Sequence, residues 1–224
     1  MPAASCWRVP AAISSTSDVR ILLTRPRPDA EALAVRVQAL GHTTFIEPLI
    51  DIAIAQGADL DLQGVQALVF TSANGARAAA QRTKRRDLLV LAVGPATAAQ
   101  AKELGFDRVS ESLGEGVDGL ARHIRETLKP ADGTLLHVTG TATAGDLKQA
   151  LAPKGFVVRT EQLYDAHAAE SLSGALIAEL AAGLIDGVMF FSPRTAVLFA
   201  TLAQTVNIGA ACTGLTAFAL SRPV

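Results

Sequence analysis

Short runs of mostly apolar residues recur along the chain, separated by longer segments in which apolar and polar residues mix. Most of these runs are apolar nearly throughout, which is typical of strands covered on both faces of a parallel sheet. We expect strands at residues 19–23, 43–49, 66–70, 88–93, 134–138, 156–164, 186–191 and 215–220.

The segments between the expected strands carry apolar residues at helical spacing. Helices are predicted at 29–41, 118–130 and 171–183, where Gly41, Asp118 with Pro130, and Ser171 with Gly183 supply end signals. Their apolar faces comprise Ala30, Leu33, Val37 and Leu40, then Leu120, Ile124 and Leu128, then Leu172, Leu176 and Leu180. Strands that alternate with helices over this length predict an α/β fold with parallel sheets.

An internal repeat organises the chain. "ILLTRPRPDAEALAVRVQALGHTTFIEPLID" from Ile21 matches "LLHVTGTATAGDLKQALAPKGFVVRTEQLYD" from Leu135 at an offset of 114 residues. "ALVFTSANGA" (67–76) matches "GVMFFSPRTA" (187–196) at an offset of 120, and "LAVGPATA" (91–98) matches "AFALSRPV" (217–224). Three matches in one order predict a duplicated α/β lobe.

Composition excludes several classes of partner. Half of the 224 residues are hydrophobic, the formal net charge is −1 and 4% are aromatic, so neither nucleic acid nor an acidic membrane is an expected partner. No apolar run approaches the roughly 20 residues of a membrane span. Cys6 and Cys212 lack metal-ligand spacing, so we expect free thiols in a cytoplasmic protein. Residues 1–18 are small and polar, which predicts a disordered leader.

Two of the apolar runs end in hydroxyl residues, Thr71-Ser72 and Ser192. In open α/β sheets ligands lie beyond the carboxyl ends of the strands, where helix N-termini offer free N–H groups to anions. Gly75 and Gly94 would let backbone approach such a ligand. N-capping alone explains each serine equally well. The paired occurrence in both halves favours an anion-binding cleft between two lobes.

Reactive motifs are scarce. The sequence contains no GxxxxGK[ST], GxGxxG or GxSxG motif and no cluster with metal-ligand spacing. His137 lies inside an expected strand, which favours a core or hydrogen-bonded role, and His42, His123 and His167 are expected to face solvent. This composition suits a reaction that depends on positioning and backbone hydrogen bonds.

The ordered motifs "LLTRP", "VFTSANGA", "AVGPATAAQAKELGF", "TEQLYDA" and "MFFSPRTAVLF" resemble the uroporphyrinogen-III synthase family over about residues 19–220. The resemblance implies two flavodoxin-like lobes, 19–48 with 166–224 and 51–162, joined by crossing segments near 47–51 and 162–166. It also implies that hydroxymethylbilane, a linear tetrapyrrole with eight carboxylates, is closed without a cofactor or metal into uroporphyrinogen III, with ring D inverted.

The same resemblance assigns site residues. Tyr164 occupies the family's tyrosine position and is the candidate that helps the ring A hydroxyl leave, although an ordinary half-buried packing role fits it equally. Carboxylate-binding positions are Thr71, Ser72, Gly94, Thr97 and Ser192. Arg25 and Arg194 add positive charge, and Arg194 departs from the small residue usual in the family.

The end of the chain departs further from the family. Relatives continue from a "GPTTA"-like motif into more helix and strand, whereas this sequence ends at "LSRPV", so we expect a truncated lobe with uncertain activity. The rival interpretation is a non-catalytic two-lobed binding protein for an anionic small molecule, which would need an export signal that is not visible. A monomer is expected.

Overall fold

A computed structural model describes residues 18–112, 116–141 and 145–219. The expected leader falls outside this range except for Asp18, as does the terminal "LSRPV". The chain divides into two compact units, which we call unit 1 (Met1–Asp51 with His167–Val224) and unit 2 (Ile52–Ala166). Unit 1 is therefore assembled from both ends of the chain, and unit 2 from its middle.

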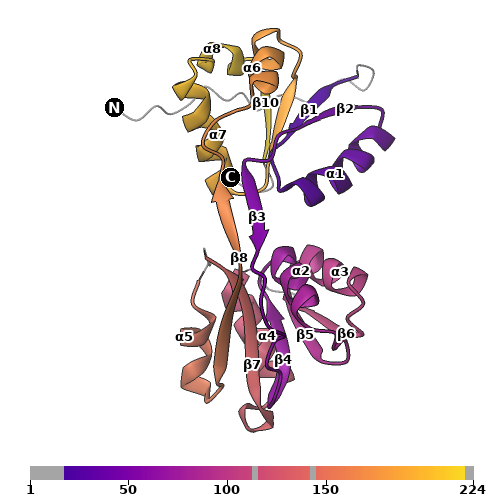
Figure 1. The fold of residues 1–224 in the computed structure, drawn as a ribbon, viewed down its shortest axis with the longest axis vertical. Coiled ribbons are helices and arrows are strands. Elements are labelled where there is room, and N and C mark those ends of the chain that lie inside the picture. The colour runs from indigo at the N-terminus through magenta and orange to yellow at the C-terminus, as the bar shows by residue number, and fades with distance from the viewer. Residues whose placement is uncertain (1–17, 113–115, 142–144, 220–224) are drawn as a thin grey trace. The chain divides into compact units, whose positions relative to one another are not determined.

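Unit 1 is built on a four-stranded parallel sheet in the order β10-β9-β1-β2 (Figure 1). Ile21 and Leu23 on one sheet face contact α1, and Leu22 on the other contacts the cluster of α6, α7 and α8. This alternation along one strand buries both faces of the sheet. The elements are β1 (Arg20–Leu23), α1 (Arg27–Ala39), β2 (Thr43–Ile46), α6 (Gly174–Ala181), β9 (Gly187–Phe190), α7 (Pro193–Thr205), α8 (Gly209–Cys212) and β10 (Thr216–Ala219).

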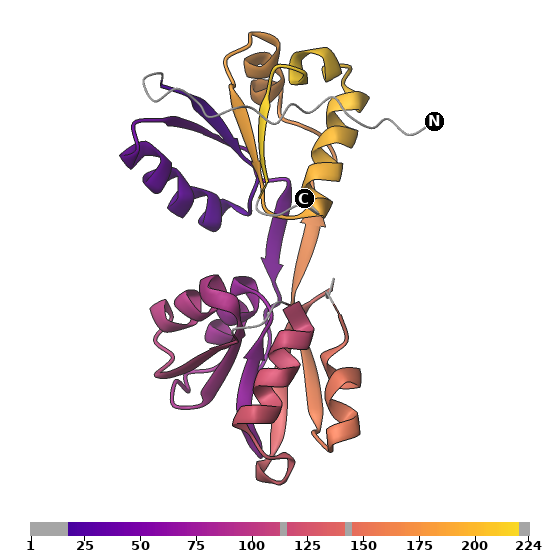
Figure 2. The same ribbon diagram turned by 180° about the vertical axis from the view of Figure 1, so that it is seen from behind.

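Unit 2 has a six-stranded sheet in the order β3-β8-β7-β4-β5-β6. Helices α2 and α3 pack on one face, and α4 lies across the other, which Figure 2 shows from behind. The elements are β3 (Ile50–Ile54), β4 (Val65–Phe70), α2 (Ala73–Arg82), β5 (Leu89–Val93), α3 (Gly94–Glu103), β6 (Arg108–Ser112), α4 (Gly116–Thr127), η1 (Pro130–Asp132), β7 (Thr134–Gly140), α5 (Leu147–Leu151), η2 (Ala152–Lys154) and β8 (Val158–Ala168).

The predicted α/β class, with parallel sheets flanked by helices, is confirmed. Strands β3 and β6 were not foreseen. Both contain polar residues on a half-exposed edge, so neither shows the continuous apolar run of the central strands. The isoleucines of "IDIAI" do alternate at period two, which was the available signal for β3.

All three predicted helices begin at other residues than expected, α1 at Arg27, and the expected cap is wrong for two of them. Helix α4 begins at Gly116, so Asp118 lies in its first turn instead of capping it. Helix α6 is capped by Ser173, whose hydroxyl accepts the N–H of Leu176, and not by Ser171. Two serines within one turn compete for a cap, and backbone geometry decides between them.

The repeat reappears as sheet register. Ile21 pairs with Thr44 in unit 1, and Leu135 pairs with Val158 in unit 2. Both residues of the second pair lie 114 positions after those of the first, which is the offset of the repeat. Likewise Ile21 pairs with Gly187 where Leu135 pairs with Ala67. The strand order β2-β1-β9-β10 therefore corresponds to β8-β7-β4-β5.

The third repeat match is wrong by one residue. Gly187 pairs with Thr216, whereas the corresponding Ala67 pairs with Leu89, so Leu89 corresponds to Thr216 instead of Leu215. Because successive side chains in a strand point to opposite faces, a shift of one residue changes which side chains enter the core.

No helix in the described ranges is both long and apolar enough to cross a membrane. Cys212 is a buried free thiol, and burial raises its pKa. Cys6 lies outside the described residues.

The core of unit 2 supplies a test of the fold. Phe70 at the end of β4 is fully buried and meets Phe106 edge-on, with ring centroids 5.6 Å apart. We expect Phe70→Ala to lower the free energy of unfolding by about 3–5 kcal/mol because it leaves a cavity. Urea denaturation measures the loss. The control Val35→Ala, at an exposed position of α1, should change stability by less than about 0.5 kcal/mol. A loss below about 1 kcal/mol for Phe70→Ala would contradict the described core.

Candidate active site

The carboxyl edge of the unit 2 sheet gathers most of the expected site residues. Thr71 and Ser72 directly follow β4, Gly94 and Thr97 begin α3 after β5, and Tyr164 lies on β8 beside the last residue of β7. Parallel strands place their carboxyl ends at one edge, which brings these residues from distant parts of the sequence together.

Ser72 joins two of these elements. It has extended backbone (φ −155°, ψ 157°) and caps α2, and its Oγ accepts the N–H of Gly75 at 3.1 Å. The same Oγ lies 2.9 Å from the hydroxyl oxygen of Tyr164. The serine thus links the N-terminus of a helix to a phenol on β8.

Gly75 has a different role from the one expected. A Cβ at this position would lie 3.0 Å from the carbonyl oxygen of Val138 on β7. The missing side chain therefore lets α2 pack closely against β7, and does not by itself indicate a ligand. Gly94 is required for another reason, because its φ of +73° is unfavourable for residues with a side chain.

A register shift places Tyr164. Thr139 pairs with Gln162, but Gly140 pairs with Tyr164, so β8 contains one extra residue. Leu163 and Tyr164 consequently both belong to the core cluster on the α2 side of the sheet. A bulge of this kind redirects a side chain, and here it directs the phenol toward Ser72.

Tyr164 is 9% exposed, and its ring fits over Gly140. A Cβ at Gly140 would lie only 2.8 Å from Cζ of the ring, closer than carbon atoms approach. Tyr164 therefore packs in the core, as one of the two expected roles required. Its hydroxyl nevertheless lies within hydrogen-bonding distance of Ser72.

A second polar pair lies on the α4 side of the same edge. His137 on β7 is 5% exposed, and its Nε2 lies 3.2 Å from Thr71 Oγ1. Burial lowers the pKa of His137, and the charge of Asp146 opposes this in part. His137 also lines a pocket of about 250 Å³ with Thr139, Thr160 and Lys148.

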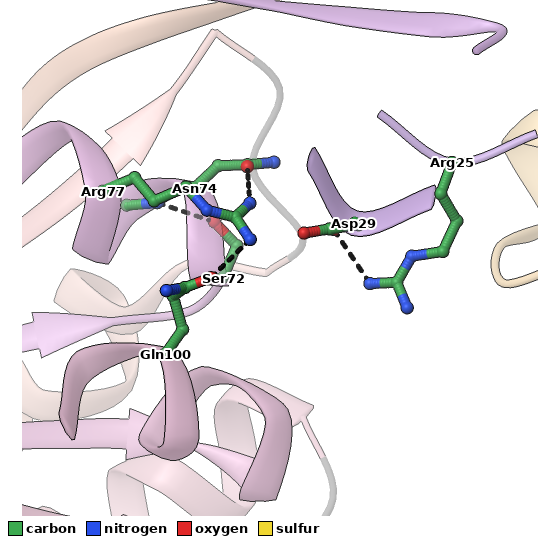
Figure 3. Close-up of polar contacts among 7 residues, drawn as sticks. Arg25, Asp29, Ser72, Asn74, Arg77 and Gln100 are labelled. Carbon is green, nitrogen blue, oxygen red and sulfur yellow. Dashed lines mark hydrogen bonds and ion pairs between the residues drawn. The ribbon is translucent and has the colours of Figure 1, made fainter. Parts of the chain in front are cut away.

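Arg77 was not among the site residues predicted from the sequence. Its guanidinium donates to Asn74 Oδ1 at 2.8 Å and to Gln100 Oε1, so it spans the first turns of α2 and the middle of α3 (Figure 3). Its three-residue spacing from Asn74, one helical turn, was the available signal. Thr97, in contrast, is buried in α3, and no partner of its hydroxyl is found among the described residues.

Unit 1 carries the corresponding loop. Ser192 caps α7 with nearly the same backbone as Ser72 (φ −151°, ψ 150°), and its Oγ accepts the N–H of Thr195 at 3.2 Å. The Ser192 and Thr195 hydroxyls are 2.7 Å apart. Arg25 forms an ion pair with Asp29 at 2.9 Å (Figure 3) and stacks on the ring of Phe191, so part of its charge is neutralised locally. Arg194 is exposed.

A family model described as uroporphyrinogen-III synthase HemD matches residues 31–224. The chain belongs to the uroporphyrinogen-III synthase family. The family places it in tetrapyrrole biosynthesis, as a cyclising enzyme that acts on a tetrapyrrole. No curated protein matches the sequence.

Two solved structures have a similar fold. The uroporphyrinogen III synthase of the extreme thermophile Thermus thermophilus, crystallised as a mutant, is 19% identical with a TM-score of 0.50, over 92% of this chain and 86% of that one. The uroporphyrinogen-III synthetase of Helicobacter pylori is 16% identical with a TM-score of 0.53, over 92% of this chain and 94% of that one. At these identities the likeness concerns the fold.

The carboxyl edge of the unit 2 sheet carries hydroxyls, the N–H groups of a helix N-terminus and the guanidinium of Arg77. Groups of these kinds bind carboxylates. No group of three or more His, Cys, Asp or Glu within the described ranges could hold a metal ion. Of the other histidines, His167 is exposed as expected. His42 is half-buried, and His123 is half-buried against Ser110 at 2.7 Å, so the expectation of solvent-facing rings was wrong for these two.

The buried His137 predicts a pH dependence of stability. Its pKa in the folded protein lies below the ordinary value of 6.5, so the unfolded chain binds more protons near and below that pH. Stability should therefore fall as the pH decreases through about 6.5 toward the folded-state pKa. Urea denaturation at about pH 7.5 and about pH 5.5 should show a smaller decrease for His137→Gln than for the wild type. Equal decreases in both proteins would show that His137 does not contribute.

Proposed function

We propose that the protein is a hydro-lyase that closes hydroxymethylbilane into uroporphyrinogen III with ring D inverted. The chain belongs to the family that has this activity. The observation that carries the proposal is the Tyr164 hydroxyl, whose oxygen lies 2.9 Å from Ser72 Oγ at the carboxyl edge of the unit 2 sheet. This arrangement supplies a positioned proton donor beside groups that bind anions.

In the first step, Tyr164 donates its proton to the departing hydroxyl of ring A. The carbon–oxygen bond breaks, its electron pair leaves with the oxygen as water, and ring A becomes a cationic azafulvene. The tyrosine oxygen keeps the electron pair of its former O–H bond and accepts a hydrogen bond from a neighbouring donor. A phenol carries a proton that it can donate to a leaving group.

In the next steps, the substituted carbon of ring D attacks the azafulvene and forms a spiro intermediate. This intermediate fragments and recloses with ring D inverted. The proton that ring D loses at the end restores the phenol, so one molecule of water leaves for each ring closed. Every carbon–carbon bond that forms joins atoms of the substrate, and for this reason we propose a reaction without a cofactor.

The carboxylates of the substrate hold it in the reactive conformation. We assign their binding in unit 2 to the N-terminus of α2, Thr71, Thr97, the backbone at Gly94 and the guanidinium of Arg77, which Asn74 and Gln100 hold in place. In unit 1 we assign carboxylate binding to Ser192 and the N-terminus of α7. We also assign it to Arg25, which lies two residues before the start of α1. We further propose that the protein works as a monomer in the cytoplasm, where Cys212 stays a free thiol.

Incubation with enzymatically prepared hydroxymethylbilane tests the activity directly. We expect uroporphyrinogen III as the main product, separated from isomer I by chromatography, because spontaneous closure does not invert ring D. A non-catalytic binding protein would leave isomer I as the product at the rate of the reaction without protein, and that outcome would overturn the proposal.

Tyr164→Phe tests the proton donor. The ring and its packing remain while the hydroxyl is lost, so we expect near-wild-type stability and a decrease in kcat of about 10²–10⁴-fold. The remaining product should still be isomer III, because the carboxylate contacts fold the bilane. A variant with wild-type kcat would show that Tyr164 is a packing residue only.

Thr97→Ala and Ser192→Ala test the carboxylate contacts. Each removes one hydroxyl, and we expect each to cost about 0.5–3 kcal/mol in kcat/KM, as for a single hydrogen bond to a charged group. Steady-state kinetics with hydroxymethylbilane measure the effect. A loss of many orders of magnitude from either change would mean that the hydroxyl takes part in the chemistry and does not merely bind.

A further inference from the structure

We propose that Ser72 is a positioning residue that acts through Tyr164: its hydroxyl donates to the phenol oxygen and so directs the phenol proton toward the substrate. This inference rests on the proposed function and extends it, because it assigns to the N-cap of α2 a role in the proton transfer. It also implies that only one of the two repeated loops has acquired this role.

The hydrogen-bonding capacity of Ser72 allows it to donate to Tyr164. A hydroxyl oxygen has one proton and two lone pairs. One lone pair of Ser72 Oγ accepts the N–H of Gly75 at 3.1 Å, and the phenol oxygen lies 2.9 Å away in another direction. If Ser72 donates to Tyr164, the phenol proton is free to point to the substrate. When that proton leaves, the Ser72 proton stabilises the negative oxygen that remains.

Backbone constraints fix both partners. Ser72 is held by its capping geometry, and Tyr164 by the extra residue in β8. The ring lies where Gly140 has no side chain, so it has little freedom to turn its hydroxyl away. Two oxygens held in this way lose little conformational entropy when the bond forms.

The repeated loop in unit 1 has the same cap without the same partner. Ser192 accepts the N–H of Thr195 just as Ser72 accepts that of Gly75, but its hydroxyl pairs with the hydroxyl of Thr195. Gly75 has no hydroxyl to offer, and a Cβ at its position would lie only 3.0 Å from the Val138 carbonyl oxygen. At the 114-residue offset of the repeat, the counterpart of Tyr164 is Ile50. The serine–tyrosine pair is therefore specific to the unit 2 copy.

A double-mutant cycle tests the coupling. We expect Ser72→Ala to lower kcat by about 10- to 100-fold, the equivalent of one hydrogen bond to a charged group, with little change in KM. In the Tyr164→Phe background the same change should lower kcat by less than about 3-fold, because the group through which Ser72 acts is already gone. Equal losses in both backgrounds would overturn the proposal. Ser72→Thr keeps a hydroxyl and should recover most of the activity.

A spectroscopic readout separates coupling from capping. Tyr164 is the only tyrosine of the chain, so labelling tyrosine with ¹³C at Cζ gives one NMR signal. Ser72→Ala should shift this signal, whereas Ser192→Ala, which removes an equivalent cap, should not. The two variants should lose similar stability to heat, since each costs a helix cap of about 1 kcal/mol. An unmoved signal in Ser72→Ala would contradict the pair.

The outcomes distinguish the inference from the function on which it depends. A wild-type protein that forms no uroporphyrinogen III refutes the proposed function, whatever the NMR signal shows. A wild-type protein that forms it, but whose Ser72→Ala and Tyr164→Phe losses simply multiply, refutes the coupling alone. If the Ser72→Ala variant does not fold, Ser72→Asn takes its place. Asparagine keeps a capping oxygen but has no hydroxyl, so this variant should also shift the Tyr164 NMR signal.

Discussion

The parallel pairing of β7 with β4 on one side and β8 on the other is the constraint on which the candidate site depends. It brings the ends of three strands to one edge, so that residues 71–72, 137–140 and 164 become neighbours. Small residues make the edge compact. Gly75 lets α2 approach the Val138 carbonyl, and Gly140 leaves room for the Tyr164 ring. A side chain at either position would separate elements whose polar groups are now within hydrogen-bonding distance.

The two faces of this edge have different chemistry. On the α2 side, Ser72 and Tyr164 form a pair of neutral hydroxyls beside the N-terminus of a helix. On the α4 side, Thr71 is paired with His137, whose burial favours the neutral imidazole. Consecutive residues of one strand end thus serve opposite faces, because side chains alternate along an extended backbone. The hydroxyl pair is the one to which we assign proton donation, and the histidine is the hydrogen-bond partner that holds Thr71.

Duplication explains both the likeness and the difference between the units. Corresponding strands have corresponding neighbours and the same register between the first two strands of each repeat, although unit 1 is assembled from the two ends of the chain. The capping serines are equivalent down to their backbone angles. Two residues differ: the one three positions after the serine is glycine in unit 2 and threonine in unit 1, and the counterpart of Tyr164 in unit 1 is Ile50. Together they decide what the serine hydroxyl meets.

The sequence by itself determined the central strands, most of the three predicted helix faces, the capping positions Ser72 and Ser192, and two of the three repeat matches. These features follow from burial and local backbone hydrogen bonding, which leave periodic and short-range signals in the chain. Leu40, expected on the apolar face of α1, instead follows the last residue of that helix and is 76% exposed. The edge strands β3 and β6 were not predicted, because partly buried strands lack the continuous apolar run that identified the others. The partners of Ser72 and Thr71, 92 and 66 residues away, were decided by tertiary structure alone. Each contact depends on strand register, and the contact of Tyr164 depends also on the extra residue in β8. Register is a property of paired strands, so no single segment of the sequence encodes it.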